Sequence, residues 1–415
     1  MINRNIKYFS ILFILFSSLL FAQRTSTYTR YGLGDIYYTY YPRALSMGNA
    51  GSAMINKDYI ELLNPASWSN LSLTRIEFSF SYDELRLSNQ DLTKNYGDGV
   101  FKGFTFAFPV SKDYGIGVAM GIAPYSRINY EVQENVTNDT TGNYTTDYQG
   151  KGGLSRVFIG STYRLPINFI LGATLEYYFG NINYKSSIQF DNSSLYPAEY
   201  ELSYGPTGFG TTIGLITPDL SGLLNSDAIS NFRLGLSANL ISKLDTDTSF
   251  VSTSSTIVDS VGAGKTKMKV PARLDLGVHI AFVNVYNIVL DYFYQPWTEF
   301  KLSNVNQLNM NNVHKISLGF EYEPQKAPGI SFWEQIMLRA GLSYEISQYK
   351  INGTDLKQFS VFGGFSLPLS DDNTIDIAME YSVRGTIEKN LMQEQFFKIN
   401  LGLSFGELWF VRYEK

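Results

Sequence analysis

Residues 395–406 read QFFKINLGLSFG and residues 374–384 read TIDIAMEYSVR, and both stretches alternate apolar with polar or small side chains. In the first stretch, Phe397, Ile399 and Leu401 fall on one face of an extended chain. Successive side chains of a strand point to opposite sides, so each stretch has one apolar face and one polar face. The period of two predicts β-strands.

The same alternation recurs along most of the chain, in segments that are long enough to cross a bilayer as tilted strands. An even number of about 14 such strands predicts an all-β fold, a transmembrane antiparallel β-barrel. We expect the strands at residues 73–82, 101–109, 115–125, 154–164, 169–180, 202–216, 231–241, 271–282, 287–295, 313–323, 335–346, 358–368, 374–384 and 395–406.

Composition favours a barrel over other membrane proteins. Aromatic residues make up 15% of the 415 residues, charged residues only 17%, and the mean hydropathy of −0.10 is too low for a bundle of membrane helices. A soluble β-sandwich would also alternate, but strand length and Tyr, Trp and Phe near strand ends favour a membrane barrel. The net charge of −5 gives no reason to expect nucleic acid as a partner.

The N-terminus predicts secretion. Arg4 and Lys7 precede the apolar run Ile11–Phe21, and Ala22 offers a small residue for cleavage before Gln23. This is the pattern of a signal peptide over residues 1–22, although an uncleaved anchor is the alternative. The run is short for a transmembrane helix. Secretion and the strand pattern together predict the bacterial outer membrane, with lipid bilayer and lipopolysaccharide as surroundings.

The connections between the expected strands alternate between long and short. Outer-membrane barrels have long outer loops and short periplasmic turns. An even strand number then places both termini in the periplasm. The long connections include residues 126–153 and 242–270.

Residues 23–72 lie between the signal peptide and the first strand of the barrel at 73–415. The segment is neither low in complexity nor strongly charged, so disorder is not expected. A barrel of about 14 strands leaves a lumen that side chains alone do not fill. We therefore expect this segment to fold inside the barrel as a plug.

The chain carries no clear catalytic or metal-binding constellation. It has no cysteine and only two histidines, His279 and His314, so neither a transition-metal site nor a catalytic triad is expected. We expect no enzyme activity and no cofactor. Inward-facing charges of both signs instead predict a luminal network that cements the structure: Arg273, Asp275, His279, Arg339, Glu345, Asp376, Glu380 and Arg384.

The N-terminal segment resembles the hatch of the FadL-type transporters, outer-membrane barrels for long-chain fatty acids and other hydrophobic compounds. Residues 43–48 (RALSMG), with Met47 and Gly48, resemble the start of that hatch. Asn64, Pro65 and Ala66 match its NPA motif. The resemblance spans most of the mature chain, is carried by short motifs, and points to a member from Bacteroidetes-like bacteria.

In that family the third strand is kinked, which opens the barrel wall toward the lipid. The resemblance implies such a kink in residues 115–125, where Gly121, Ala123 and Pro124 are the candidates. Pro124 cannot donate a hydrogen bond to the ladder. The alternative is that Pro124 only ends the strand, and Gly205–Pro206 is a competing site of disruption.

Two functions follow as hypotheses. The first is passive uptake of hydrophobic small molecules such as long-chain fatty acids, with lateral exit through the wall. The second is a scaffold or shuttle that binds a secreted or surface protein, because the outer loops are long and related shuttle barrels carry a similar N-terminal segment.

Overall fold

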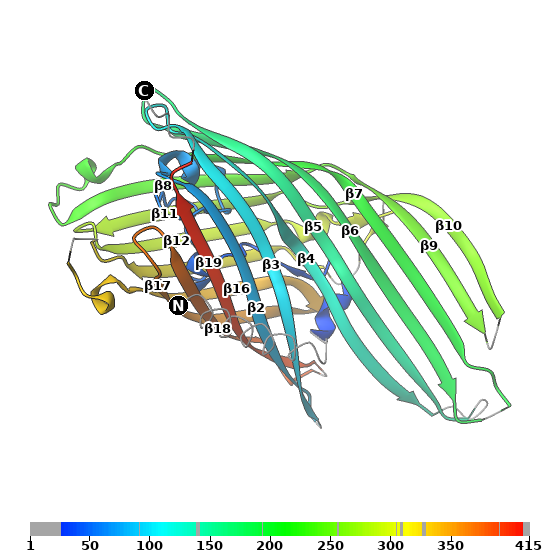
Figure 1. Cartoon of the computed structure of the whole chain (residues 1–415). Helices are drawn as coiled ribbons and strands as arrows, with labels where there is room; N and C mark the ends of the chain where they lie inside the picture. The colour runs from blue at the N-terminus through cyan, green and yellow to red at the C-terminus, as the bar shows by residue number, and fades with distance from the viewer. Residues whose placement is uncertain are drawn as a thin grey trace, which may run out of the picture.

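The structure is a computed structural model that describes residues 26–90, 92–137, 142–192, 194–254, 257–303, 305–307, 310–325, 329–389 and 391–409. The expected signal peptide lies outside the described residues. Figure 1 shows a tilted β-barrel with the N-terminal segment running through it.

Fourteen long antiparallel strands in the described chain pair in sequence order, and β19 pairs with β2 to close the ring. The predicted fourteen-stranded barrel is confirmed. The ring strands are β2 (Thr74–Ser88), β3 (Thr93–Ser111), β4 (Ile116–Val136), β5 (Tyr144–Arg164), β6 (Ile170–Phe190), β7 (Ala198–Ile216), β8 (Ile229–Ile241), β11 (Arg273–Phe282), β12 (Tyr286–Gln295), β15 (Val313–Tyr322), β16 (Met337–Ile351), β17 (Thr354–Pro368), β18 (Thr374–Gly385) and β19 (Gln393–Glu407).

The distribution of side chains is the reverse of that in a soluble protein. On the outer face, Ile316 is 54% exposed and Leu338 is 52% exposed. On the inner face, Glu321 and Asp376 are fully buried. An apolar surface around a polar interior suits a barrel that faces lipid.

The strands differ from the sequence-based expectation mainly at one end of the barrel. The prediction for residues 374–384 agrees with β18, but the strand expected at 115–125 continues in β4 to Val136. The expected loop 242–270 forms a hairpin of β9 (Leu244–Ser254) and β10 (Ile257–Lys269), which pairs with β7. These extensions have no continuous apolar face, since they project beyond the belt of lipid-facing side chains, and so they lack the alternation that revealed the others.

The two ends of the barrel are distinct. The turns β3–β4, β5–β6 and β11–β12 lie at one end, which we call the short-turn end, and the opposite end is the long-loop end. At the long-loop end, β4 to β7 and then β9 and β10 run far beyond the rest of the ring (Figure 1). We call this projecting sheet the wall.

Short elements complete the described chain: η1 (Thr27–Arg30), β1 (Asp35–Ile36), α2 (Pro42–Ser46), η2 (Pro65–Asn70), η3 (Ser221–Leu223), η4 (Trp297–Glu299), β13 (Lys301–Leu302), β14 (Val305–Asn306) and η5 (Phe332–Gln335). None of the helices among the described residues is long and apolar enough to cross a membrane.

Candidate functional site

Residues 26–73, which we call the luminal segment, lie against the inner faces of the strands. Helix α2 packs on β16 to β19, whereas η2 packs on β4 to β7 on the other side of the ring. Most side chains of the segment are buried, including Tyr40, Met47 and Trp68. The segment thus spans the interior between opposite parts of the ring.

Glycines on the inner face allow the backbone of the luminal segment to approach the strands closely. A Cβ atom added to Gly341 would lie 2.5 Å from the backbone nitrogen of Gly48, and one added to Gly319 would lie 2.6 Å from Met47 Cβ. Gly48 itself has φ of 78°, which favours glycine. The sequence-predicted Met47 and Gly48 therefore sit where a larger side chain on either surface would clash.

The predicted Asn64, Pro65 and Ala66 form a second attachment, over β7 and β8. Asn64 is fully buried and caps η2 by accepting a hydrogen bond from the Ala66 backbone. Its amide nitrogen donates to the backbone oxygens of Ser52 at 2.8 Å, and of Leu215 and Leu236 at 3.3 Å each. One side chain therefore joins a helix cap, a turn and two strands.

A buried ionic network fastens α2 to the ring. Arg43 contacts Glu321 at 2.7 Å, and Arg339 contacts the same carboxylate at 2.6 Å. Arg339 also lies 3.3 Å from Asp376, which accepts a hydrogen bond from Tyr41 at 2.6 Å. Of the predicted network residues, Arg339 and Asp376 meet here. The partners Arg43 and Tyr41 come from the luminal segment, and strand alternation carries no signal for such contacts.

A second cluster of charges lies around β1. Arg384 contacts Asp35 and Glu394, both at 2.7 Å, and Glu380 contacts Lys398 at 3.0 Å. Burial alone would raise the pKa of Asp35, but the Arg384 guanidinium outweighs it and holds that pKa below its usual value. Asp35 is therefore an anion that anchors β1 to β18.

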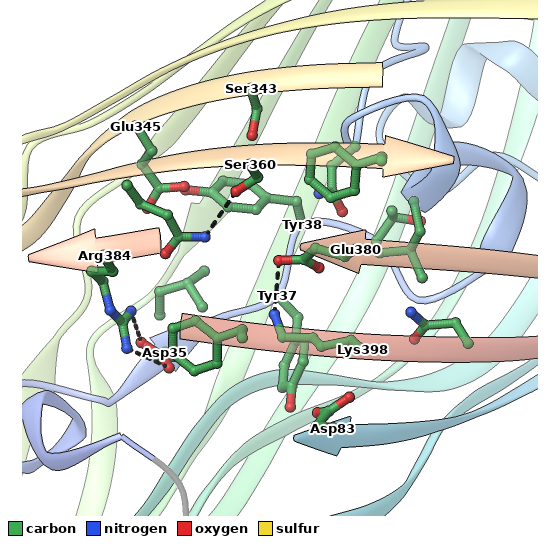
Figure 2. A pocket seen from close by; sticks show the side chains of 18 of the residues that line it. Asp35, Tyr37, Tyr38, Asp83, Ser343, Glu345, Ser360, Glu380, Arg384 and Lys398 are labelled. Atoms are coloured by element: carbon green, nitrogen blue, oxygen red, sulfur yellow. Dashed lines mark hydrogen bonds and ion pairs between the residues drawn. The ribbon is translucent and has the colours of Figure 1, made fainter. Parts of the chain in front are cut away.

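Figure 2 shows the cavity that these charges line, next to Tyr37 and Tyr38 of the luminal segment. Its volume is about 120 Å³, and the predicted Glu345, Glu380 and Arg384 all contribute to its lining. Charged side chains share the lining with aromatic and aliphatic ones, so the cavity suits water or the polar part of a ligand.

The remaining predicted charges lie on β11 and are not part of either network. Arg273 donates to the Tyr37 backbone oxygen at 3.4 Å, and His279 Nε2 lies 2.9 Å from Asn287 Oδ1. Among the described residues, neither Asp275 carboxylate oxygen has a hydrogen-bond partner within 3.5 Å. The structure therefore divides the expected single network into separate groups.

The ring has a gap in its hydrogen-bonding ladder between β3 and β4. The two strands pair from Ser111 and Ile116 as far as Phe104 and Ile122 and no further. Beyond that point β3 continues to Thr93 paired only with β2, while β4 continues to Val136. We call this break between residues 93–103 of β3 and residues 123–136 of β4 the gap.

The predicted kink residues lie where the gap begins. Gly121 is within the last paired stretch, and Ala123 and Pro124 are the first residues of β4 beyond it. Pro124 has no N–H to donate to β3. The β4–β5 register also shifts between Pro124 and Ser126, which is a β-bulge that bends a strand.

Past the bulge, β4 pairs with the luminal segment instead of β3. Asp35 and Ile36 of β1 align with Arg127 and Ser126. The Arg127 guanidinium also reaches across the gap to the Asp98 carboxylate of β3. In this structure an ion pair therefore bridges two strands that share no ladder there.

A large apolar cluster lies beside this part of β4, at the long-loop end. Tyr125, Ile128 and Tyr130 of β4 pack in one cluster with Trp297 and Phe300. The other buried members are Leu33, Leu154, Tyr178, Ile182, Leu244, Met268, Val270, Met310 and Val313. This part of the lumen is thus lined by apolar side chains, in contrast to the cavity lined by charged ones.

Comparison with solved structures identifies the class of fold. The structure is similar to a Pseudomonas aeruginosa FadL homologue, with a TM-score of 0.61 at 12% identity over 89% of this chain and 99% of that one. It is also similar to the Pseudomonas putida toluene transporter TodX (0.60, 13%, 91% and 100%) and the Ralstonia pickettii toluene transporter TbuX (0.58, 14%, 89% and 98%). At such identities the likeness shows the fold alone, that of outer-membrane FadL-type channels.

A family model described as BamG matches residues 1–414, and the chain belongs to the BamG family. No curated protein matches the sequence. The expected FadL-type fold is confirmed, whereas the expected bacterial source stays a prediction.

Proposed function

We propose that this protein is a passive outer-membrane channel for hydrophobic small molecules such as long-chain fatty acids, and that they leave sideways through the gap. The observation that carries the proposal is the loss of pairing between β3 and β4 beyond Phe104 and Ile122. A break in the ladder is costly unless another group pairs the edge. Here β1 pairs part of the β4 edge and keeps it away from β3.

The interior offers a route with two kinds of lining. The apolar cluster around Tyr125 and Trp297 would receive a hydrophobic molecule from the long-loop end, after local rearrangement of its side chains. The charged cavity lies next to the gap, where Lys102 and Arg127 contribute to the lining. A molecule with a polar end and an apolar tail suits this arrangement, because its polar end can stay in the charged cavity while its tail passes through the gap to the lipid.

In this proposal the luminal segment is the plug that the sequence predicts at residues 23–72, and it closes the lumen between transport events. Its fastening by Arg43 and Asn64 supports a fixed position. We also propose that the short-turn end and both termini face the periplasm, because an even number of strands returns the chain to the end where it started.

Stapling the gap is expected to stop transport. The natural chain has no cysteine, so an Asp98→Cys, Arg127→Cys double variant places two unique thiols on opposite edges of the gap. In proteoliposomes, uptake of a fluorescent long-chain fatty acid should fall to the level of empty liposomes after treatment with a short bifunctional maleimide. A monofunctional maleimide should leave most of the uptake.

The matched control is Lys350→Cys, Asp355→Cys, which removes a charge pair between β16 and β17 where the strands remain paired. Cross-linking there should not change uptake. Equal uptake before and after the gap is stapled would exclude lateral exit by this route.

A second candidate function is a scaffold for a secreted or surface protein, and the wall favours it. The β5–β6 ladder continues from Arg164 and Ile170 to Tyr144 and Phe190, and the β9–β10 hairpin widens the projecting sheet. Three exposed aromatic side chains, Tyr148, Tyr196 and Tyr200, lie on this part of the chain. A sheet that extends beyond the bilayer offers surface to a partner rather than to lipid.

Removing the hairpin is expected to release such a partner. Leu244 and Met268 are aligned across β9 and β10, so residues 245–267 can be replaced by an Asn-Gly turn without moving the strand ends. Affinity purification from outer membranes should then lose a protein that co-purifies in stoichiometric amount with the intact chain. Recovery of lipopolysaccharide alone with both chains would rule out the scaffold.

A further inference from the structure

Two buried carboxylates lie where the turn of the luminal segment at Gly51 and Ser52 meets β11 and β12. Asp291 Oδ2 accepts hydrogen bonds from the backbone nitrogens of Gly51 and Ser52, both at 2.9 Å. Asp275 lies on the inner face of β11, which pairs with β12. The two carboxylates interact electrostatically with each other, and the Ser52 hydroxyl lies near both of them.

Four oxygen atoms at this place have no hydrogen-bond partner within 3.5 Å among the described residues. They are both carboxylate oxygens of Asp275, Oδ1 of Asp291 and Oγ of Ser52. Asp275 is 3% exposed, and Asp291 and Ser52 are fully buried. Buried polar atoms are nearly always paired, so a group of four without partners requires a ligand or a proton.

Gly277 of β11, which has no side chain, leaves space for these oxygens. Gly277 is aligned with Asp291 across the β11–β12 ladder, and Asp275 precedes it on the same face. A Cβ atom on Gly277 would overlap Ser52 Oγ and would lie 2.8 Å from Asp291 Oδ1. Ser52 Oγ and Asp291 Oδ1, two of the four oxygens without partners, therefore both lie next to Gly277.

The nearby protein cations contact other groups. Arg273 donates to the Tyr37 backbone oxygen, and Lys315 Nζ lies 4.1 Å from the centre of the Tyr38 ring. In the described part of the chain neither cation forms a hydrogen bond or ion pair with Asp275 or Asp291. When both carboxylates are ionised, their charges are therefore without direct compensation in a buried place, which is unfavourable unless a cation binds.

We propose that Asp275, Asp291 and Ser52 bind a hard metal cation that fastens the luminal segment to β11 and β12. Carboxylate and hydroxyl oxygens are the donors that Ca²⁺ prefers, and Na⁺ shares this preference for oxygen. The described residues hold no group of three or more His, Asp or Glu side chains placed to bind a metal. With only two carboxylates, we expect a weak Ca²⁺ site, on the order of 10⁻⁴–10⁻³ M.

The test uses the full barrel refolded without lipopolysaccharide, which itself binds divalent cations. The protein is treated with EGTA in sodium-free buffer, and its thermal unfolding is followed during titration with CaCl₂ or, separately, with NaCl. Unfolding temperature should rise in a saturable manner with one of them, and equilibrium dialysis against radioactive calcium should find about one bound ion per chain in the first case.

Ser52→Ala is the mild variant, because the hydrogen bond from the backbone nitrogen of residue 52 to Asp291 remains. It should raise the cation concentration needed for half of the effect several-fold. Asp275→Asn should raise this concentration about tenfold or more because a charged ligand is lost. Tyr41→Phe is the matched control: it removes a hydrogen bond between the luminal segment and Asp376 and should keep the full response. Absence of any cation-dependent shift in the natural chain, or an equal shift in all variants, would overturn the site.

Discussion

Glu321→Gln is expected to destabilise the folded barrel by about 3–5 kcal/mol, because it leaves two buried guanidinium groups without their shared anion. Glu321 accepts hydrogen bonds from Arg43 at 2.7 and 2.9 Å and from Arg339 at 2.6 Å. All three side chains are almost fully buried. Glutamine preserves the shape of the side chain, so the loss reports on charge rather than packing.

The measurement is reversible unfolding in urea, in detergent, monitored by tryptophan fluorescence, since Trp68 and Trp297 are buried. Glu199→Gln is the matched control: its ion pair with Lys185 lies on the wall, where both side chains are about 40% exposed. Such an exposed pair contributes less than about 1 kcal/mol. Equal effects of the two substitutions would show that the buried network does not hold the luminal segment.

The barrel itself was largely predictable because the lipid imposes one rule on every strand. Ile375, Ile377 and Met379 must face the hydrocarbon, so the period of two appears in the residues of β18 and gives bounds that agree with the structure. The strands of the wall that project beyond the bilayer are under no such constraint. The sequence of β9 and β10 is rich in Ser, Thr and Gly, and its strand structure depends on pairing with β7, which a linear pattern does not reveal.

The candidate site was predictable only in part. Strand alternation predicts that charged side chains such as Arg339 and Asp376 face the lumen, and both are buried there. Their partners do not follow, since Arg43 and Glu321 are 278 positions apart in the chain. The gap is similar: Pro124 signals a weakness in β4, but only the fold shows that β1 replaces β3 beside Arg127.

The gap has a direct consequence for the backbone amides of β3. Between Thr93 and Gly103 this strand pairs with β2 alone, whereas between Phe104 and Ala107 it pairs with β2 on one side and with β4 on the other. In an antiparallel ladder every second residue directs its N–H to a given neighbour. The amides that point from residues 93–103 into the gap therefore lack a ladder partner and exchange without local unfolding.

Every second amide in residues 93–103 is accordingly expected to exchange with deuterium at least about a hundredfold faster than amides of β18, whose exchange needs the opening of two complete ladders. The neighbouring amides, which pair with β2, should be protected and serve as an internal control. The residues of β4 that pair with β1 should also be protected.

Residue-resolved hydrogen–deuterium exchange in lipid nanodiscs tests the central claim, that the barrel ring is open between β3 and β4, most directly. An open edge should give an alternating pattern of fast and slow amides in residues 93–103, and slow exchange at residues 104–107, which are paired on both sides. Uniform protection of both stretches, equal to that of β18, would mean that β3 and β4 pair along their length in the membrane and that no lateral exit exists there.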